Sequence, residues 1–229
     1  MEKLLDEIES YWSTRTEGYS EVNHKELAGT QKNAWLKVLT SQFPDKPKEE
    51  IRILDIGTGP GFFPVILAEA GYHVDAVDYT EGMLEKAKEN AGDLCRNIRF
   101  LRMDAQKLDF EDNTFDVVIS RNLTWNLEHP DVAYREWVRV LKVGGRLLNF
   151  DANWYGYLYE EEQRKAYEND RKNVENNSLD DHYLCTDIER MERIALQVPL
   201  SKISRPQWDV KTLREAGLLG IRTDTEIWK

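Results

Sequence analysis

Residues 51–63 read IRILDIGTGPGFF, and this stretch is the strongest indication of the fold in the sequence. The apolar run predicts a buried strand that ends at Asp55, and residues 62–70 predict a helix. Between them the chain turns through Gly57, Gly59 and Gly61, where a ligand can touch backbone that a Cβ would block. Free N–H groups in such a turn, beside a helix N-terminus, attract an anionic group of a ligand. Asp55 is expected to face the cavity where open α/β sheets bind ligands.

The spacing of the glycines narrows the kind of ligand. A dinucleotide-binding fingerprint has glycine at its first, third and sixth positions. Counted from Gly57, the sixth position is Phe62 and the fifth is Gly61, so the pattern is Asp-x-Gly-x-Gly-x-Gly. A glycine-rich turn alone can also be a plain tight connection, so the signals further along the chain matter.

Three further strand signals follow in order. Residues 73–78 predict a short strand ending at Asp78, about twenty residues after the glycine turn, the offset at which an acid reaches ribose hydroxyls. Residues 98–103 predict a third strand, followed by Asp104. The continuous apolar run 115–119 is typical of a central parallel strand buried on both faces, and it ends at Arg121 and Asn122.

Together these signals, over residues 51–150, resemble the class I S-adenosylmethionine (SAM) methyltransferases of the bacterial small-molecule type. The Asp-x-Gly-x-Gly-x-Gly pattern is similar to motif I of that family, and LKVGGRL at 141–147 resembles another of its landmarks. The resemblance implies an α/β, Rossmann-like, doubly wound and mostly parallel seven-stranded sheet. It also implies helices on both faces of the sheet and a helical lid insertion.

The resemblance implies SAM as cofactor and S-adenosylhomocysteine as product. In the family, the acid at Asp78 holds the ribose, and the residues at Tyr79 and Met83 flank the adenine, although Met83 alone is more typical of plain core. The acid at Asp104 accepts from the adenine amino group, and the N–H of Ala105 reaches a ring nitrogen. Backbone and side chains at the end of the fourth strand approach the methionine part. The expected cofactor set is Tyr19, Asp55, Gly57, Thr58, Gly59, Gly61, Asp78, Tyr79, Met83, Asp104, Ala105, Arg121 and Asn122.

Residues 1–43 predict a helical cap made of two helices, separated by a loop at 14–23 (TRTEGYSEVN). The pattern Tyr-Trp-x-x-Arg-x-x-x-Tyr at 11–19 resembles an N-terminal segment that folds over the SAM site. Tyr11, Trp12 and Tyr19 are then candidates to cover the sulfonium. Trp12 reads more simply as helix core, whereas Tyr19, beside Gly18 in the predicted loop, is the better contact.

The remaining divisions are a SAM-binding core at 51–151, an insertion at 152–206 and a C-terminal part at 207–229. Insertions at this point form the substrate lid in the family, because loops at strand carboxyl ends control access to the cavity. The aromatic run ANWYGYLY at 152–159 either lines a substrate pocket or packs the lid onto the core. In the C-terminal part a helix is followed by IRTDTEIW, whose alternation predicts a strand. That strand would complete the sheet with another near residues 200–204.

Composition bounds the partners. The formal net charge of −11 argues against nucleic acid and anionic membranes as substrates, since both carry negative phosphates. No apolar run is long enough to span a bilayer, and the acidic start is unlike a secretory signal. Cys95 and Cys185 lie far apart without metal-ligand spacing, so no metal is expected. We expect a cytoplasmic protein, monomeric or homodimeric.

The predicted function is in-line methyl transfer to an unidentified small molecule. A general base is needed only if the acceptor must lose a proton, and the candidates are His24, His129, His182 and Asp151, none of which is assigned. A non-catalytic SAM-binding protein remains an alternative, because no catalytic residue stands out. A nucleotide-cofactor oxidoreductase is a further alternative, against which Phe62 at the third-glycine position speaks.

Overall fold

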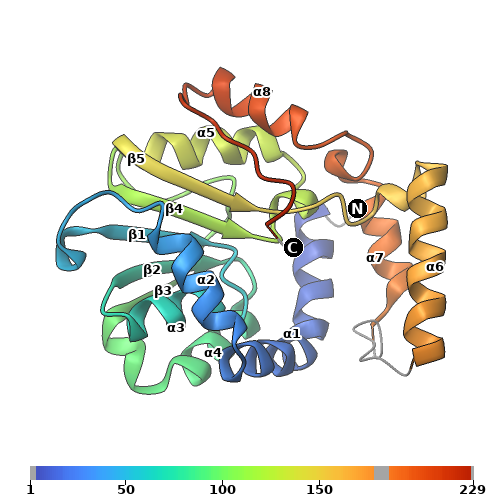
Figure 1. Ribbon diagram of the computed structural model, residues 1–229, viewed down its shortest axis with the longest axis horizontal. Helices are drawn as coiled ribbons and strands as arrows, with labels where there is room; N and C mark the ends of the chain where they lie inside the picture. The colour runs from blue at the N-terminus through green and yellow to red at the C-terminus, as the bar shows by residue number, and fades with distance from the viewer. Residues whose placement is uncertain (1–3, 178–185, 228–229) are drawn as a thin grey trace.

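The computed structural model describes residues 4–177 and 186–227, and in it five strands form one parallel sheet in the order β3-β2-β1-β4-β5 (Figure 1). The strands are β1 (Arg52–Ile56), β2 (His73–Asp78), β3 (Ile98–Arg102), β4 (Phe115–Arg121) and β5 (Leu141–Phe150). After β3 the chain returns to the other side of β1 to form β4. The strand order therefore reverses between β1 and β4, and ligands of such sheets bind outside the carboxyl ends at this point.

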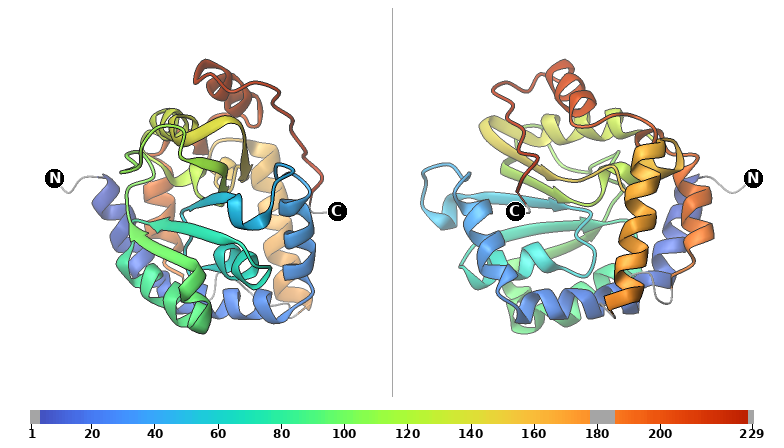
Figure 2. Two further views of the ribbon diagram at one scale, coloured as in Figure 1. Left: turned by 90° about the vertical axis from the view of Figure 1, so that its left-hand side faces the viewer. Right: turned by 45° about the vertical axis from the view of Figure 1, so that its right-hand side comes forward.

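Helices cover both faces of the sheet, as Figures 1 and 2 show, so the predicted doubly wound α/β class is confirmed. Alternate residues of β1 serve the two faces: Ile53 packs in one hydrophobic cluster and Leu54 in the other. The first face carries α2 (Gln31–Thr40), α3 (Phe62–Glu69) and α4 (Glu81–Ala91), and the second carries α5 (Pro130–Val140) and α8 (Gln207–Glu215). Both faces of the strands are thus buried, which explains the continuous apolar run of β4.

The prediction of seven strands was wrong. In the described chain the sheet ends at β5, and residues 200–204 and 221–224 form no strand. Leu218 and Ile221 instead pack, half-buried, on the cluster beneath α8. Alternation in the sequence shows that one side of a segment is apolar. A coil that packs on a helix can bury that side as well as a strand at the edge of a sheet can. Trp228 of the predicted strand lies outside the described residues.

The predicted loop at 14–23 was also wrong, because α1 runs as one helix over Leu4–Ala28, and the break comes at Gly29 and Thr30. The polar residues that suggested a loop have partners inside the fold. The hydroxyl of Thr14 donates to the carbonyl of Tyr11 at 2.6 Å, and Asn90 of α4 donates to Ser20 and Asn23, each at 3.4 Å. Such back-bonding hydroxyls bend helices, and α1 visibly changes direction along its length (Figures 1 and 2).

Residues 152–206 carry η4 (Gly156–Leu158), α6 (Glu161–Asn177), α7 (Ile188–Ala195) and η5 (Pro199–Ser201), beside α1 at the carboxyl end of the sheet (Figure 1). The helix α7 packs on α1 through Met191 and Ile194. Tyr155 stacks on Trp125 with ring centroids 5.0 Å apart, and Tyr157 is buried. Tyr155 therefore packs the insertion onto the core, whereas Tyr157 stacks within the insertion on Tyr167 of α6, at a centroid distance of 4.1 Å. No helix in the described residues is long and apolar enough to cross a membrane.

Candidate functional site

A pocket opens at the carboxyl ends of β1, β2, β3 and β4, and α1 covers it. The arrowheads of the strands in Figure 1 point toward this helix. Leu5, Ile8, Glu9 and Trp12 line the pocket from one face of α1, since residues three and four apart share a helix face. Ten of the thirteen residues in the expected cofactor set line the same pocket, namely Tyr19, Gly57, Gly59, Asp78, Tyr79, Met83, Asp104, Ala105, Arg121 and Asn122.

The N–H groups of the glycine turn are not free, contrary to expectation. The N–H groups of Gly57 and Thr58 donate to the carbonyl of Val77 at 2.8 and 3.0 Å. The N–H of Gly59 donates to Oδ2 of Asp78 at 2.9 Å, and that of Gly61 to the carbonyl of Thr58 at 3.1 Å. A turn that binds pyrophosphate offers these donors to the ligand, so this geometry argues against a dinucleotide cradle.

The three glycines have separate roles, although all adopt positive φ (70°, 53° and 93°). A Cβ on Gly59 would meet the ring of Tyr19 at 3.5 Å, in ordinary contact. A Cβ on Gly61 would lie 3.0 Å from that of Ala87 in α4. Gly61 therefore lets two helices approach each other, and it lies outside the pocket lining.

Asp78 is the carboxylate that joins the turn to the second strand. Its Oδ1 accepts from the N–H of Thr80 and its Oδ2 from the N–H of Gly59, both at 2.9 Å. Each oxygen keeps a further lone pair, so the group can also accept from two hydroxyls of a ligand. Burial raises the pKa of Asp78 above its ordinary value, which the two backbone bonds partly oppose.

Asp55 was expected to line the pocket, but it lies buried in β1, with 2% of its surface exposed. Burial raises its pKa to about 7, and the neighbouring charge of Asp78 acts in the same direction. Thr58 is buried as well and lies outside the pocket lining. Both residues support the turn from beneath, because the strand ends one residue after Asp55 and the backbone rises over it.

The end of the pocket near β3 suits a flat group with hydrogen-bonding edges. Asp104 lines it, and its Oδ1 accepts from the backbone and side-chain N–H groups of Gln106 at 2.8 and 3.1 Å. Apolar side chains form the walls: Met83 on α4 and Leu127 are buried, and Met103 is half-buried. An apolar slot with a carboxylate at its edge can hold a purine whose amino group faces that carboxylate.

The opposite end of the pocket contains Arg121 and Asn122. Arg121 donates to Glu26 of α1 at 2.6 and 3.3 Å, and its guanidinium lies over the rings of Phe62, Trp35 and Phe63 at 5.1 to 5.8 Å. Asn122 has a φ of 56°, and its N–H donates to the carbonyl of Phe150 at 2.8 Å. The backbone thus turns sharply at the end of β4 and points both side chains into the space under α1.

Aromatic rings cover this end of the pocket. Trp12 contacts Tyr19 at a centroid distance of 5.7 Å, Tyr11 at 5.5 Å and Trp125 at 6.5 Å. Trp12 and Tyr19 line the pocket, whereas Tyr11 lies behind them. Trp12, which the sequence favoured as helix core, is therefore a pocket residue. Trp125 is buried behind Trp12 and does not line the pocket.

The general-base candidates do not converge on the pocket. Asp151 accepts from the hydroxyl of Thr124, from the N–H of Trp125 at 3.0 Å and from that of Ala152 at 2.8 Å, and it pairs with Arg205 at 3.2 Å. It is thus a structural group that holds neighbouring loops together. His129 and His24 are exposed and line no part of the pocket, and His182 lies outside the described residues. No group of three potential metal ligands occurs in the described chain.

Fold and pocket together define an α/β protein with a nucleoside-type site over the carboxyl ends of a parallel sheet. Residues 54–149 match the family model of a methyltransferase domain. A demethylmenaquinone methyltransferase from Paenarthrobacter aurescens is 34% identical over 149 residues, 65% of this chain and 56% of the relative. The ubiquinone/menaquinone biosynthesis C-methyltransferase UbiE of Pseudomonas entomophila is 41% identical over 103 residues, 42% of this chain and 40% of the relative.

A solved structure agrees with the fold. The chain superposes on a candidate SAM-dependent methyltransferase from Methanococcus maripaludis with a TM-score of 0.58, at 22% identity, over 89% of this chain and 82% of that one. Over its core the chain is thus similar to class I SAM-dependent methyltransferases, in sequence and in fold. The chain spans about half the length of the two curated relatives, 56% of the one from Paenarthrobacter aurescens and 40% of the one from Pseudomonas entomophila.

Proposed function

We propose that the chain is a SAM-dependent methyltransferase that acts on a small molecule. The observation that carries the proposal is the arrangement of the pocket: Asp78 and Asp104 follow two neighbouring strands and line one cavity, and the glycine turn between β1 and α3 has no N–H left for a phosphate. That combination suits an adenosyl group without a pyrophosphate.

The residues present fit SAM part by part. Asp78 would accept from the ribose hydroxyls, and Tyr79 and Met83 would flank the adenine. Asp104 would accept from the adenine amino group, with the N–H of Ala105 at a ring nitrogen. Arg121 and Asn122 would lie at the methionine part. The acids that line the pocket (Glu9, Asp78, Asp104 and Glu128) suit a ligand that carries a sulfonium and an ammonium group.

Bound SAM supplies an activated methyl group for direct displacement by a nucleophile. The chain contributes position and exclusion of water, and holding two reactants together can supply about 7–11 kcal/mol of the barrier reduction. Trp12 and Tyr19 line the pocket, where their rings would attract a cation. A general base is required only when the acceptor must lose a proton, as a hydroxyl group or a ring carbon must.

The acceptor is proposed to enter from the side of the β4 and β5 ends, with residues 152–206 acting as its lid. That region packs on α1 and on Trp125, next to the rings that cover the pocket. The two curated relatives are named for demethylmenaquinone and for ubiquinone or menaquinone biosynthesis. A reduced quinone ring is therefore the first acceptor class to test, alongside amines, thiols and hydroxyl compounds.

The test is methyl transfer from methyl-labelled SAM to each acceptor class, followed by mass spectrometry of the product. We expect one acceptor class to gain a single methyl group while S-adenosylhomocysteine forms in equal amount. An Asp78→Ala variant should lose this turnover. Binding of SAM without turnover across the whole acceptor panel would instead favour a non-catalytic SAM-binding protein.

A further inference from the structure

The pocket contains one positively charged side chain among its described lining residues, that of Arg121. Its two terminal nitrogens are engaged by Glu26, at 2.6 and 3.3 Å, but Nε is buried and has no hydrogen-bond partner in the described structure. An unpaired buried N–H costs about 1–3 kcal/mol, and more for a charged group. Such an atom next to a ligand pocket indicates a missing acceptor.

A carboxylate is the ligand group that suits this charged donor. SAM carries a carboxylate on its methionine part, and in this pocket the N–H groups of Gly57, Thr58, Gly59 and Gly61 are all spent on protein oxygens. The remaining charged lining residues are acids, which repel a carboxylate. Arg121 is therefore the group in the described pocket with both the charge and the free donor that a carboxylate needs.

The position of the guanidinium agrees with this role. It lies over Phe62 and Phe63, the first two residues of α3, at 5.1 and 5.8 Å. It therefore lies against side chains of the first turn of α3, which follows the glycine turn. The charge of Arg121 also reaches Tyr19 and Asp55, whose pKa values it lowers against the larger effect of burial.

We propose that Arg121 binds the α-carboxylate of SAM through Nε, and that the negative charge of Glu26, on the terminal nitrogens of the same guanidinium, opposes this binding. The inference rests on the proposed function, because it requires SAM as the ligand. Glu26 and Arg121 are equally shielded, each with 19% of its side chain exposed, so their attraction is only partly screened by water. The ion pair between Glu26 and Arg121 ties α1 to the end of β4.

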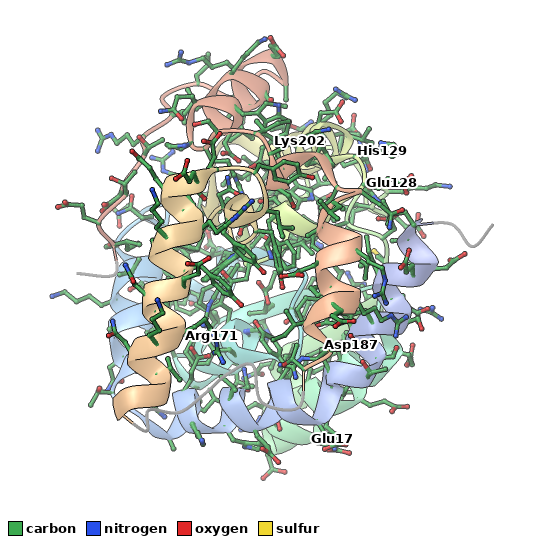
Figure 3. All side chains as sticks on the ribbon, turned by 90° about the vertical axis from the view of Figure 1, so that its right-hand side faces the viewer. Glu17, Glu128, His129, Arg171, Asp187 and Lys202 are labelled. Atoms are coloured by element: carbon green, nitrogen blue, oxygen red, sulfur yellow. The ribbon has the colours of Figure 1, made fainter. Side chains whose placement is uncertain are left out.

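The test is a thermodynamic cycle between a protein group and a ligand group. Dissociation constants are measured by isothermal titration for SAM and for decarboxylated SAM, which lacks only the carboxylate. The proteins are the wild type, Arg121→Met, Arg121→Lys and Glu26→Gln. Glu17→Gln is the matched control, since Glu17 also lies on α1 and pairs with a cation, Lys86 at 2.9 Å, yet points outward from the helix (Figure 3).

We expect Arg121→Met to weaken SAM by roughly 10-fold or more, the range for a hydrogen bond between charged groups, and decarboxylated SAM by less than about two-fold. Arg121→Lys should keep part of the preference for SAM, because it keeps the charge without the fork. Glu26→Gln should tighten SAM several-fold and leave decarboxylated SAM unchanged, because a negative charge close to the bound carboxylate has been removed. Glu17→Gln should change neither ligand.

Equal weakening of both ligands by Arg121→Met would show a structural role and overturn the inference alone. Weaker binding of SAM by Glu26→Gln would also overturn the inference alone. This second test does not depend on whether Arg121→Met folds. If the wild type binds neither ligand, the proposed function fails together with this inference. The outcomes for the two proposals are therefore distinct.

Discussion

Asp55 is the residue whose chemistry departs most from its sequence-based interpretation. It was expected in the pocket wall, but it lies beneath the glycine turn, where burial raises its pKa to about 7 from 3.8. In this range the folded protein holds the proton more tightly than the unfolded chain does. Asp55 therefore opposes folding increasingly as the pH rises from 3.8 to about 7.

A cation bound above this carboxyl should favour its ionised form and release its proton. We therefore predict that SAM affinity rises as pH increases from about 6 to about 8, and levels off once Asp55 is ionised in the free protein. Isothermal titration in two buffers of different ionisation enthalpy measures the released proton directly. In Asp55→Asn the pH dependence should disappear, and a dependence that persists there would assign the proton to another group.

Asp78 offers a second prediction at the same scale. Asp78→Ala should weaken SAM by roughly 1.5–3 kcal/mol, because a charged acceptor is lost from the ribose hydroxyls. Asp75→Ala is the control: Asp75 lies on the same strand and pairs with Arg99 at 2.8 Å, away from the pocket. Equal affinity in the two variants, measured by titration, would mean that Asp78 does not contact the ligand.

At the scale of elements, the glycine turn is set as much by the packing of helices as by the ligand. Gly61 and Gly71 both have φ near 90°, but only Gly61 lies against another helix, where a Cβ would be 3.0 Å from that of Ala87. A Cβ on Gly71 would meet no atom of the described chain within 4 Å, apart from its own neighbours in sequence. Comparing substitutions at the two glycines therefore separates the cost of backbone strain from the cost of a steric clash.

We predict that Gly71→Ala lowers the free energy of unfolding by about 1–2 kcal/mol, the cost of a left-handed alanine. Gly61→Ala should lose that amount plus about 1–3 kcal/mol for overpacking between α3 and α4. Urea denaturation followed by circular dichroism gives both values. Equal losses in the two variants would show that α4 moves away freely.

At the scale of the whole molecule, Asp116 joins segments at the amino ends of the strands, opposite the pocket. Burial alone would raise its pKa, but hydrogen bonds from Lys142, Lys46 and the N–H of Arg52, at 2.7, 2.6 and 3.1 Å, lower it to about 2. The stabilisation is therefore fully present above the unfolded value of 3.8 and is lost as the pH falls from 3.8 to about 2.

Asp116→Asn should thus lower the free energy of unfolding by about 2 kcal/mol at pH 7, where the wild type is charged and paired. The difference between the two proteins should shrink progressively below pH 4. Chemical denaturation at several pH values checks this. A constant difference from pH 7 to pH 3 would show that the loss comes from packing and not from the charge.

The sequence predicted the parallel core well, because each strand there is a short apolar run that ends at a polar residue. It failed for α1 and for the C-terminal part. Polar residues within 14–23 have hydrogen-bond partners on α4, which no local sequence pattern reveals. The alternation at 221–228 predicted a strand, but the described part of this segment pairs with no strand of the sheet. Leu127 and Asn126 entered the pocket unpredicted, because the short turn after β4, η3 (Thr124–Asn126), is fixed by tertiary contacts with Asp151.

The central claim is that the pocket holds an adenosyl group joined to an amino acid and not a dinucleotide. Isothermal titration of the wild type with S-adenosylhomocysteine and, separately, with NADH tests it most directly. The account predicts one-to-one binding of S-adenosylhomocysteine and no measurable heat with NADH. Tighter binding of NADH, or no binding of S-adenosylhomocysteine at saturating concentration, would contradict it.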